Sequence, residues 1–404
     1  MKFCKLSQLL LVSAAGLAVG ALLTACQIVT VDYAFVASSA TADNSANGSV
    51  AVYAVDSQSG ALRKGADTVS SGGVSPVALA VSPDYQHLYV ANSGDNTVVH
   101  FTIASNGKLT AKDTVTLAGP PTALTVSKSG KFLYVVSGST SATLTEFPLS
   151  SGTIGSATAE EALTLPGSNA DDRMVPTGVT VLANNNAVFA TAYDLDAYNP
   201  GGTTTSTANP GWVFGYSIDG SGNLAVSPGG PFRAGIKPSG IAADPTNSYL
   251  YVTDFASGQM IGYTIQSTSV LTFLLNGPFT TGSQPTAIAI DPRGKFIYVS
   301  NGLSSTVSAY AIDLNTGTPS AAVNATGSST NVTDTTPLAV AVDPALGRYV
   351  YTANSLGNTV SGFRLDPTAG TLTQTQGTPY TAGQKPTALV LVPHGNHSIQ
   401  SITP

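Results

Sequence analysis

The sequence is poor in charged residues and in cysteine. Only 9% of its 404 residues are Asp, Glu, Lys or Arg, whereas 42% are hydrophobic. A chain of this composition can bury a large core, so general disorder is excluded. The net charge of −6 and the lack of a long basic run argue against a nucleic-acid partner, because binding phosphates requires clustered Lys and Arg.

The two cysteines, Cys4 and Cys26, lie in or directly after a segment that has the layout of an export signal. The segment begins with Lys2 and Lys5, continues as an apolar run over residues 9–23 and ends in small residues. This order is typical of a cleaved signal rather than a permanent membrane span. We therefore expect an exported chain without disulfides, stabilised by its own packing.

The end of this segment, Leu23-Thr24-Ala25-Cys26, resembles a bacterial lipobox. The resemblance implies cleavage before Cys26 and lipidation of Cys26, which makes the membrane a partner, since several acyl chains anchor a protein durably. Gln27 follows, where an Asp would favour the inner membrane in such lipoproteins. The expected location is therefore the cell envelope, with the outer membrane favoured over the inner.

No helical periodicity of useful length follows Cys26. Instead, a sequence repeat of about 50 residues is present, and repeats of this length are typical of propellers and arrays. One part of the repeat is a proline followed by small and alternating apolar residues, at Pro76, Pro121, Pro176, Pro238, Pro285, Pro337 and Pro386. Another part contains an aromatic residue, at Phe35, Tyr89, Tyr134, Phe189, Tyr251, Tyr298 and Tyr351.

Each repeat contains four short strand-like segments that end at turns, the pattern of one propeller blade. We predict an all-β fold, a seven-bladed β-propeller with four antiparallel strands per blade. The chain begins with a copy of the second strand and ends with a copy of the first, so the terminal strands should pair in one blade and close the ring. The predicted segments are a signal peptide (1–25), a lipidated tether (26–32), the propeller (33–395) and a tail (396–404).

These repeat sequences resemble those of the YVTN and lactonase family of seven-bladed propellers. The match rests on Tyr89-Val90-Ala91-Asn92, Tyr251-Val252-Thr253-Asp254, Tyr298-Val299-Ser300-Asn301 and Tyr351-Thr352-Ala353-Asn354, together with turns such as Asp291-Pro292-Arg293-Gly294-Lys295. The resemblance implies this propeller fold over almost the whole exported chain. It does not imply one function, because propellers with this repeat include both enzymes and surface binders.

Several recurring polar residues are interpreted as structural. Asp-Pro turns fix the backbone locally, strand-ending amides bond the following turn, and the recurring tyrosines pack between blades. The residues interpreted in this way, besides the tyrosines, are Asp244, Asp291, Asp343, Asn92, Asn301 and Asn354.

The loops from the second to the third strand and from the fourth to the next first strand share one irregular face of the predicted ring, where function is expected. The fourth blade has the longest of these loops, and charged and aromatic residues gather there and in the fifth blade. The candidate ligand-binding residues are Asp171, Asp172, Arg173, Tyr193, Asp194, Asp196, Tyr198, Trp212, Arg233, Lys237, Asp254 and Phe255. A solvated rim without a function is an equally acceptable interpretation of this set.

Acid–base catalysis finds little support in the sequence. None of the four histidines, His87, His100, His394 and His397, falls on the irregular face. Arg173 or Arg233 could stabilise an oxyanion, with Asp194 or Asp171 as base. The Arg-His pair that the resemblance implies for lactonases is absent, since the matching positions read Val175-Pro176-Thr177 and Lys237-Pro238-Ser239. The catalytic residues thus stay unassigned.

No cofactor is expected, and no metal site is predicted. Calcium held by Asp194, Asp196, Asp171 and Asp172 is a weaker alternative, because the regular spacing of a calcium loop is missing. The preferred function is an envelope-anchored scaffold that binds a protein, a glycan or a small molecule. The alternative is a hydrolase or cycloisomerase that resembles 6-phosphogluconolactonase and acts on a lactone through Asp and Arg.

Overall fold

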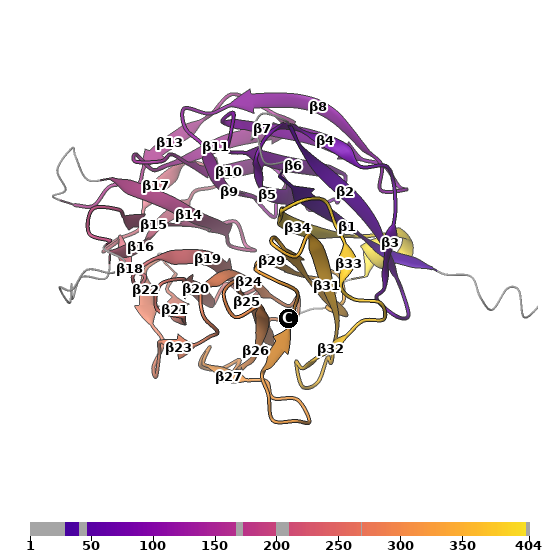
Figure 1. The fold of residues 1–404 in the computed structure, drawn as a ribbon. Coiled ribbons are helices and arrows are strands. Elements are labelled where there is room, and N and C mark those ends of the chain that lie inside the picture. Colours follow the sequence, from indigo (N-terminus) through magenta and orange to yellow (C-terminus); the bar gives the residue numbers. More distant parts are fainter. Residues whose placement is uncertain (1–28, 40–46, 167–172, 199–209, 268, 401–404) are drawn as a thin grey trace, which may run out of the picture.

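The computed structural model describes residues 29–39, 47–166, 173–198, 210–267 and 269–400. These residues form seven antiparallel sheets arranged as the blades of a propeller (Figure 1), as predicted. The predicted signal peptide and Cys26 lie outside the described residues. Within the described part, no helix has the length and apolar character needed to cross a membrane.

The innermost strands of blades 1 to 7 line the axis of the ring. Six begin at the recurring proline, and the strand of blade 4 begins at Met174, two residues before Pro176. In blade order they are β34 (Pro386–Pro393), β5 (Pro76–Val81), β9 (Pro121–Val126), β14 (Met174–Val181), β19 (Pro238–Ala243), β24 (Pro285–Ile290) and β29 (Pro337–Val342).

The second and third strands form the buried middle of each blade. The second strands are β1 (Thr30–Ser38), β6 (His87–Asn92), β10 (Phe132–Ser137), β15 (Ala187–Asp194), β20 (Tyr249–Asp254), β25 (Phe296–Asn301) and β30 (Tyr349–Asn354). The third strands are β2 (Asn47–Asp56), β7 (Thr97–Ile103), β11 (Thr143–Ser150), β16 (Gly211–Ile218), β21 (Gln259–Ile265), β26 (Thr306–Ile312) and β31 (Thr359–Leu365).

The outer strand is continuous only in blade 2, as β8 (Leu109–Thr116), and elsewhere it is split into two short pieces that pair with the same third strand. The pieces are β3 (Leu62–Lys64) and β4 (Val69–Val74), β12 (Thr153–Ile154) and β13 (Ala159–Ala162), β17 (Leu224–Val226) and β18 (Phe232–Arg233), β22 (Leu271–Phe273) and β23 (Phe279–Thr280), β27 (Pro319–Ala321) and β28 (Thr330–Val332), and β32 (Leu372–Gln374) and β33 (Tyr380–Thr381). The short helical turn η1 (Gly395–Ile399) follows β34.

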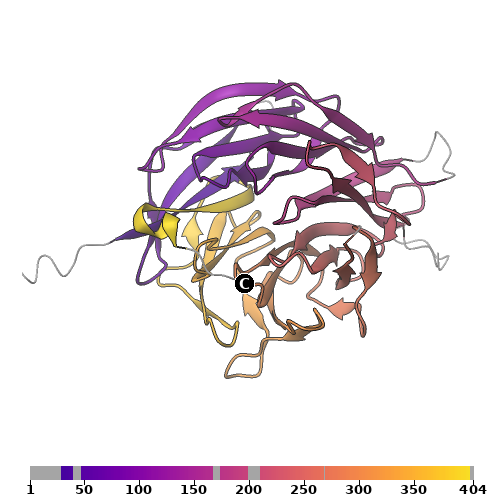
Figure 2. The same ribbon diagram turned by 180° about the vertical axis from the view of Figure 1, so that it is seen from behind.

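Blade 1 is assembled from both ends of the chain. Strand β34 pairs with β1 in antiparallel register from Asp32↔Pro393 through Phe35↔Val390, and β1 pairs with β2 on its other side. Figure 2 shows η1, in yellow, beside the indigo strands of the same blade. The first blade is therefore held together by the chain ends.

Two predicted boundaries differ from the structure. Strand β1 begins at Thr30, within the predicted tether 26–32, because Val31 and Asp32 are buried at the start of the sheet. The predicted tail 396–404 begins inside η1, whose His397 is buried.

The core lies between neighbouring blades. The aromatic residue of each second strand is fully buried; Tyr89, for example, belongs to one apolar cluster with Leu133 and Val135 of the next blade. Near the axis, hydroxyl groups join adjacent blades: Ser239 Oγ donates to the carbonyl of Pro285 at 2.6 Å, and Thr286 Oγ1 donates to that of Pro337 at 2.7 Å. Neighbouring blades are therefore joined by hydrogen bonds near the axis as well as by apolar packing.

Candidate functional site

Three loops of blades 4 and 5 meet on the irregular face: the one after β15, the one before β19 and the one after β20. The last two are joined directly, since the Phe255 backbone N–H donates to the carbonyl of Lys237 at 2.8 Å. The loop after β15 folds back on the entry to its own blade, where the Leu195 N–H donates to the carbonyl of Arg173. The structure thus places side chains from both blades close together.

Asp254, at the end of β20, fixes the path of the loop that leads into β19. Its carboxylate is buried and accepts the backbone N–H groups of Ile236 at 2.8 Å and Lys237 at 2.9 Å. Gly235 has a φ of +78°, and a Cβ there would lie 2.3 Å from Asp254 Oδ2, so the loop requires glycine. Asp254 is therefore a residue that positions Lys237.

Lys237 extends over a group of aromatic rings. Its Nζ lies 5.4 Å from the ring centroid of Tyr193, 5.2 Å from that of Tyr198 and 4.9 Å from that of Phe255. Tyr193 and Tyr198 pack edge to face, with their centroids 5.4 Å apart. Ring faces attract a cation within about 6 Å, so these contacts hold the ammonium group on this surface. We call Lys237 and its three rings the Lys237 cluster.

A second cation–aromatic pair lies farther out in blade 4. Arg233 of β18 is opposite Trp212 of β16 in the sheet, and its guanidinium carbon lies 3.9 Å from the indole centroid. Arg233 and Asp254 also line a pocket of about 460 Å³, whose other walls include Gln259, Phe273 and Pro278. A pocket of this size, with mixed apolar and polar walls, can accept a small molecule.

Arg173 and Asp196 form an exposed ion pair at the edge of the site. Arg173 Nε donates to Asp196 Oδ1 at 2.9 Å, and the Arg173 backbone N–H donates to Oδ2 at 3.2 Å. Hydrogen bonds from Arg173 hold the pKa of Asp196 below its usual range. Asp194 Oδ1 accepts the N–H groups of Asp196 and Ala197 and thereby shapes the turn. Both carboxylates have partners within the protein. The calcium alternative also requires Asp171 and Asp172, which lie outside the described residues, so it stays a prediction.

Ten of the twelve candidate residues are described, and hydrogen bonds and cation–aromatic contacts join them into three groups: the Lys237 cluster with Asp254, the pair Arg233 and Trp212, and Arg173 with Asp194 and Asp196. Asp171 and Asp172 lie outside the described residues. The carboxylates of Asp194, Asp196 and Asp254 are all engaged, whereas Lys237 faces a mainly aromatic surface. The arrangement suits stabilisation of negative charge on a flat ligand better than removal of a proton.

The structural interpretations of the repeated residues are confirmed. Asp244 Oδ1 accepts the N–H groups of Ser248 and Tyr249, and Asp291 Oδ1 accepts those of Lys295 and Phe296. Each buried amide donates a hydrogen bond to the first residue of the next strand: Asn354 Nδ2 donates to Thr359 Oγ1 at 3.1 Å, and Asn301 and Asn92 make the equivalent bond. Asp343 accepts backbone N–H groups of its own turn, as Asp244 and Asp291 do.

The histidines lie away from the Lys237 cluster but are not isolated. His100 is buried, with Nδ1 2.6 Å from Asp113 Oδ1 and Nε2 2.9 Å from His87 Nδ1. His397 contacts Asp32 and Asp343. Sequence reasoning missed both groups, because their members come from separate strands or segments and no local motif marks them.

Comparisons with known proteins agree with this architecture. The family described as "Lactonase, 7-bladed beta-propeller" matches residues 24–116 and 103–400. The 6-phosphogluconolactonase of Yersinia pestis (strain Pestoides F) is 39% identical over 59 residues, which are 15% of this chain and 18% of that protein. The matched segment therefore spans less than a fifth of this curated relative.

Solved structures show the same fold at low sequence identity. A putative 6-phosphogluconolactonase from Bacteroides uniformis ATCC 8492 has a TM-score of 0.71 at 16% identity, covering 90% of this chain and 100% of that one. The periplasmic gluconolactonase PpgL of Pseudomonas aeruginosa has a TM-score of 0.69 at 20% identity, covering 90% and 99%. Because the family match extends over nearly the whole chain, the protein belongs to the lactonase family of seven-bladed β-propellers.

Proposed function

We propose that the protein is an exported lactone hydrolase whose site is the Lys237 cluster and the neighbouring arginines. The family match supports this alternative better than the scaffold interpretation. The observation that carries the proposal is the ammonium group of Lys237 over three aromatic rings on the irregular face. A lactone substrate would use the cation to stabilise charge on its carbonyl oxygen and the flat apolar rings to hold its own ring.

The proposed chemistry is hydrolysis: water adds to the lactone carbonyl carbon, the ring C–O bond then breaks, and a proton from the attacking water passes to the departing ring oxygen, which gives the open hydroxy acid. The attack places negative charge on the carbonyl oxygen, and a preorganised cation that meets this charge lowers the barrier. Lys237 takes that role, and Asp254 positions it by holding its backbone N–H. The rings of Tyr193, Tyr198 and Phe255 would support the apolar face of the sugar ring.

The substrate class we infer is an unphosphorylated sugar-acid lactone. The export-like segment 1–25 favours a substrate outside the cytoplasm, whereas sugar phosphates are cytosolic metabolites. The similar fold of PpgL, a periplasmic gluconolactonase of Pseudomonas aeruginosa, supports the same choice. Anchoring through lipidated Cys26, with the outer membrane favoured, is part of this proposal.

The test is turnover of glucono-lactone and of 6-phosphoglucono-lactone, measured by acid release at constant pH. Lys237→Met should lower kcat/KM about 10²-fold, the typical loss when one oxyanion donor is removed. Lys385→Met is the matched control, because Lys385 precedes Pro386 as Lys237 precedes Pro238. The control should keep the wild-type rate.

Two results would contradict the proposal. Turnover that survives Lys237→Met would move the site elsewhere, and faster hydrolysis of the phosphorylated lactone would overturn the substrate class. Inactivity of the folded wild-type protein on both lactones and on a wider lactone panel would leave the binding scaffold as the better account. For the anchor, Cys26→Ala should shift the protein from the membrane fraction to the soluble fraction.

A further inference from the structure

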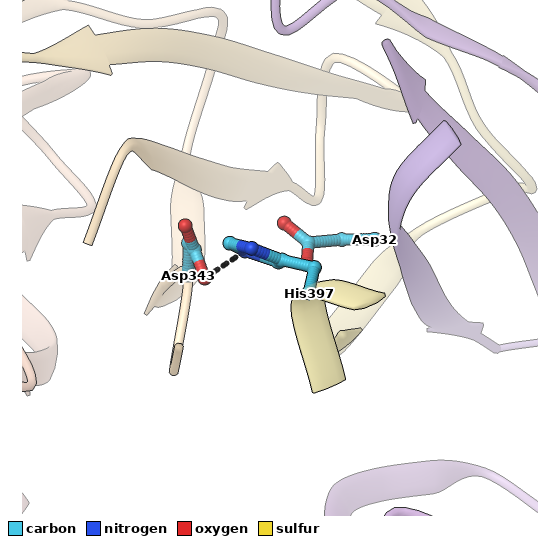
Figure 3. A group of neighbouring side chains, drawn as sticks. All are labelled: Asp32, Asp343 and His397. Carbon is cyan, nitrogen blue, oxygen red and sulfur yellow. Dashed lines mark hydrogen bonds and ion pairs between the residues drawn. The ribbon is translucent and has the colours of Figure 1, made fainter. Parts of the chain in front are cut away.

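Three segments far apart in the sequence bring Asp32, Asp343 and His397 together. They lie on the face of the ring that carries the hairpins between first and second strands, opposite the Lys237 cluster. Asp32 lies in β1 of blade 1, Asp343 follows β29 in the first hairpin of blade 7, and His397 lies in η1. Figure 3 shows both carboxylates turned toward the imidazole ring. All three residues are buried, with exposed fractions of 0% for each aspartate and 5% for the histidine.

The distances within this group exceed those of charge-assisted hydrogen bonds, although the contact of His397 with Asp343 is within hydrogen-bond range. His397 Nε2 lies 3.2 Å from Asp343 Oδ1 and 3.4 Å from Asp32 Oδ1. A charge-assisted N–H···O bond is usually about 2.7–2.9 Å long. Ligands at about 2.0–2.1 Å from a tetrahedral zinc ion lie about 3.3 Å apart, which is close to both distances.

Asp32 has unmet bonding capacity. Neither of its carboxylate oxygens has a hydrogen-bond partner, although the side chain is fully buried. A buried carboxylate without partners is costly, and a metal ion is one of the groups that can compensate it.

The other two side chains are oriented as metal ligands commonly are. Asp343 is fixed by the N–H groups of Ala345 at 2.9 Å and Arg348 at 3.0 Å. His397 Nδ1 lies 2.8 Å from Gln400 Oε1, so its N–H can be donated there while the Nε2 lone pair faces the carboxylates. An outer acceptor of this kind orients metal-binding histidines.

We propose that Asp32, Asp343 and His397 form a divalent metal site, best suited to Zn²⁺, that fastens the C-terminal turn across blades 1 and 7. The three ligand atoms lie within 4.8 Å of one another. One nitrogen and two carboxylate oxygens are ordinary zinc ligands, and the two negative charges balance the ion. Because blade 1 contains both chain ends, the ion would stabilise the place where the ring closes.

The experiment uses the full chain, purified in mild detergent without a polyhistidine tag and stripped of metal with a chelator. Titration with ZnCl₂ in a calorimeter should show one ion per chain, and saturation should raise the melting temperature by several degrees, since a ligand that binds only the folded state stabilises it. Asp32→Asn and His397→Gln, with unchanged circular dichroism, should each abolish both effects. Gln400→Leu should weaken binding about 10–100-fold, as loss of an orienting partner does.

Two matched controls separate this site from other histidines. His394→Gln removes a ring of the same segment that packs against Tyr33, with centroids 4.9 Å apart. His87→Gln removes one member of the His87–His100 pair. Both variants should bind zinc as the wild type does. The proposal would be overturned if the folded wild type did not bind zinc. It would also be overturned if His87→Gln lost zinc binding while Asp32→Asn kept it. In either case, His397 would bridge the two carboxylates as a protonated ring.

Discussion

The recurring tyrosines contribute more than apolar area, because most of their hydroxyl groups reach a neighbouring blade. Tyr251 donates to the carbonyl of Gly317 at 2.6 Å, Tyr298 to that of Gly370 at 2.8 Å and Tyr351 to that of Gly60 at 2.6 Å. Each acceptor glycine has a positive φ in the turn between a third and a fourth strand. The ring thus packs the core while the hydroxyl joins two blades.

The bond of Tyr351 crosses from blade 7 to blade 1, so its removal tests this joint. Tyr351→Phe should lower the free energy of unfolding by about 1–2 kcal/mol, because the carbonyl of Gly60 loses a buried donor. The measurement is urea unfolding followed by tryptophan fluorescence. Tyr53→Phe is the control, since Tyr53 donates to Thr381 at the exposed surface, and its effect should stay below about 0.5 kcal/mol. An equal loss in both variants would contradict a special role for the buried bond.

At the scale of the element, the turn between the third and fourth strands repeats one device. An aspartate caps the turn with its carboxylate: Asp219 accepts hydrogen bonds from Asn223, and Asp366 accepts the N–H groups of Ala369 and Thr368. These bonds favour the ionised form and lower the pKa of both carboxyls. The turns are therefore more stable when the aspartates are charged.

This turn gives the protein a specific acid sensitivity. Because the folded pKa of each carboxyl lies below its unfolded value of about 3.9, the stabilisation is present above that value and is lost as the pH falls through the folded pKa. The urea midpoint should therefore fall as the pH drops below the unfolded value of about 3.9 and on through the lower folded pKa values. The double variant Asp219→Asn and Asp366→Asn keeps the turn geometry but cannot titrate, so its midpoint should fall less. An identical pH profile would exclude these turns as a source.

The elements that repeat were predictable from the sequence, whereas the clusters that depend on loop paths were not. The prolines of the first strands and the aromatics of the second strands recur because every blade packs against the axis and against its neighbours in the same way. Lys237 could be placed on the irregular face by counting strands, but its contact with Tyr193 and Tyr198 depends on how a long loop folds back. The group around His397 depends on the docking of η1, which no local pattern signals.

At the scale of the whole molecule, we expect stability to depend on blade 1, in which β34 pairs with β1. The innermost strand of this blade, β34, pairs with β1, and Thr387 Oγ1 donates to the carbonyl of Pro76 in blade 2 at 2.7 Å. Without β34, the ring would have an open sheet edge next to the axis.

Deletion of residues 386–404 should therefore abolish the cooperative thermal transition, as recorded by circular dichroism. A synthetic peptide of residues 384–400, added in excess, should restore the transition because it supplies the missing strand. A scrambled peptide of the same composition is the control. An unchanged melting temperature after the deletion would show that six blades and an incomplete seventh suffice.

The position of β1 between β34 and β2 also has a mechanical consequence. Tension on the amino end of the chain acts along β1, and two hydrogen-bonded ladders then resist it in shear. Tension on the carboxyl end meets only one ladder, because β34 pairs with β1 alone. The protein should therefore resist a force applied at its amino-terminal side better than one applied at its carboxyl-terminal side. A protein anchored through its amino end would bear force on that more resistant side.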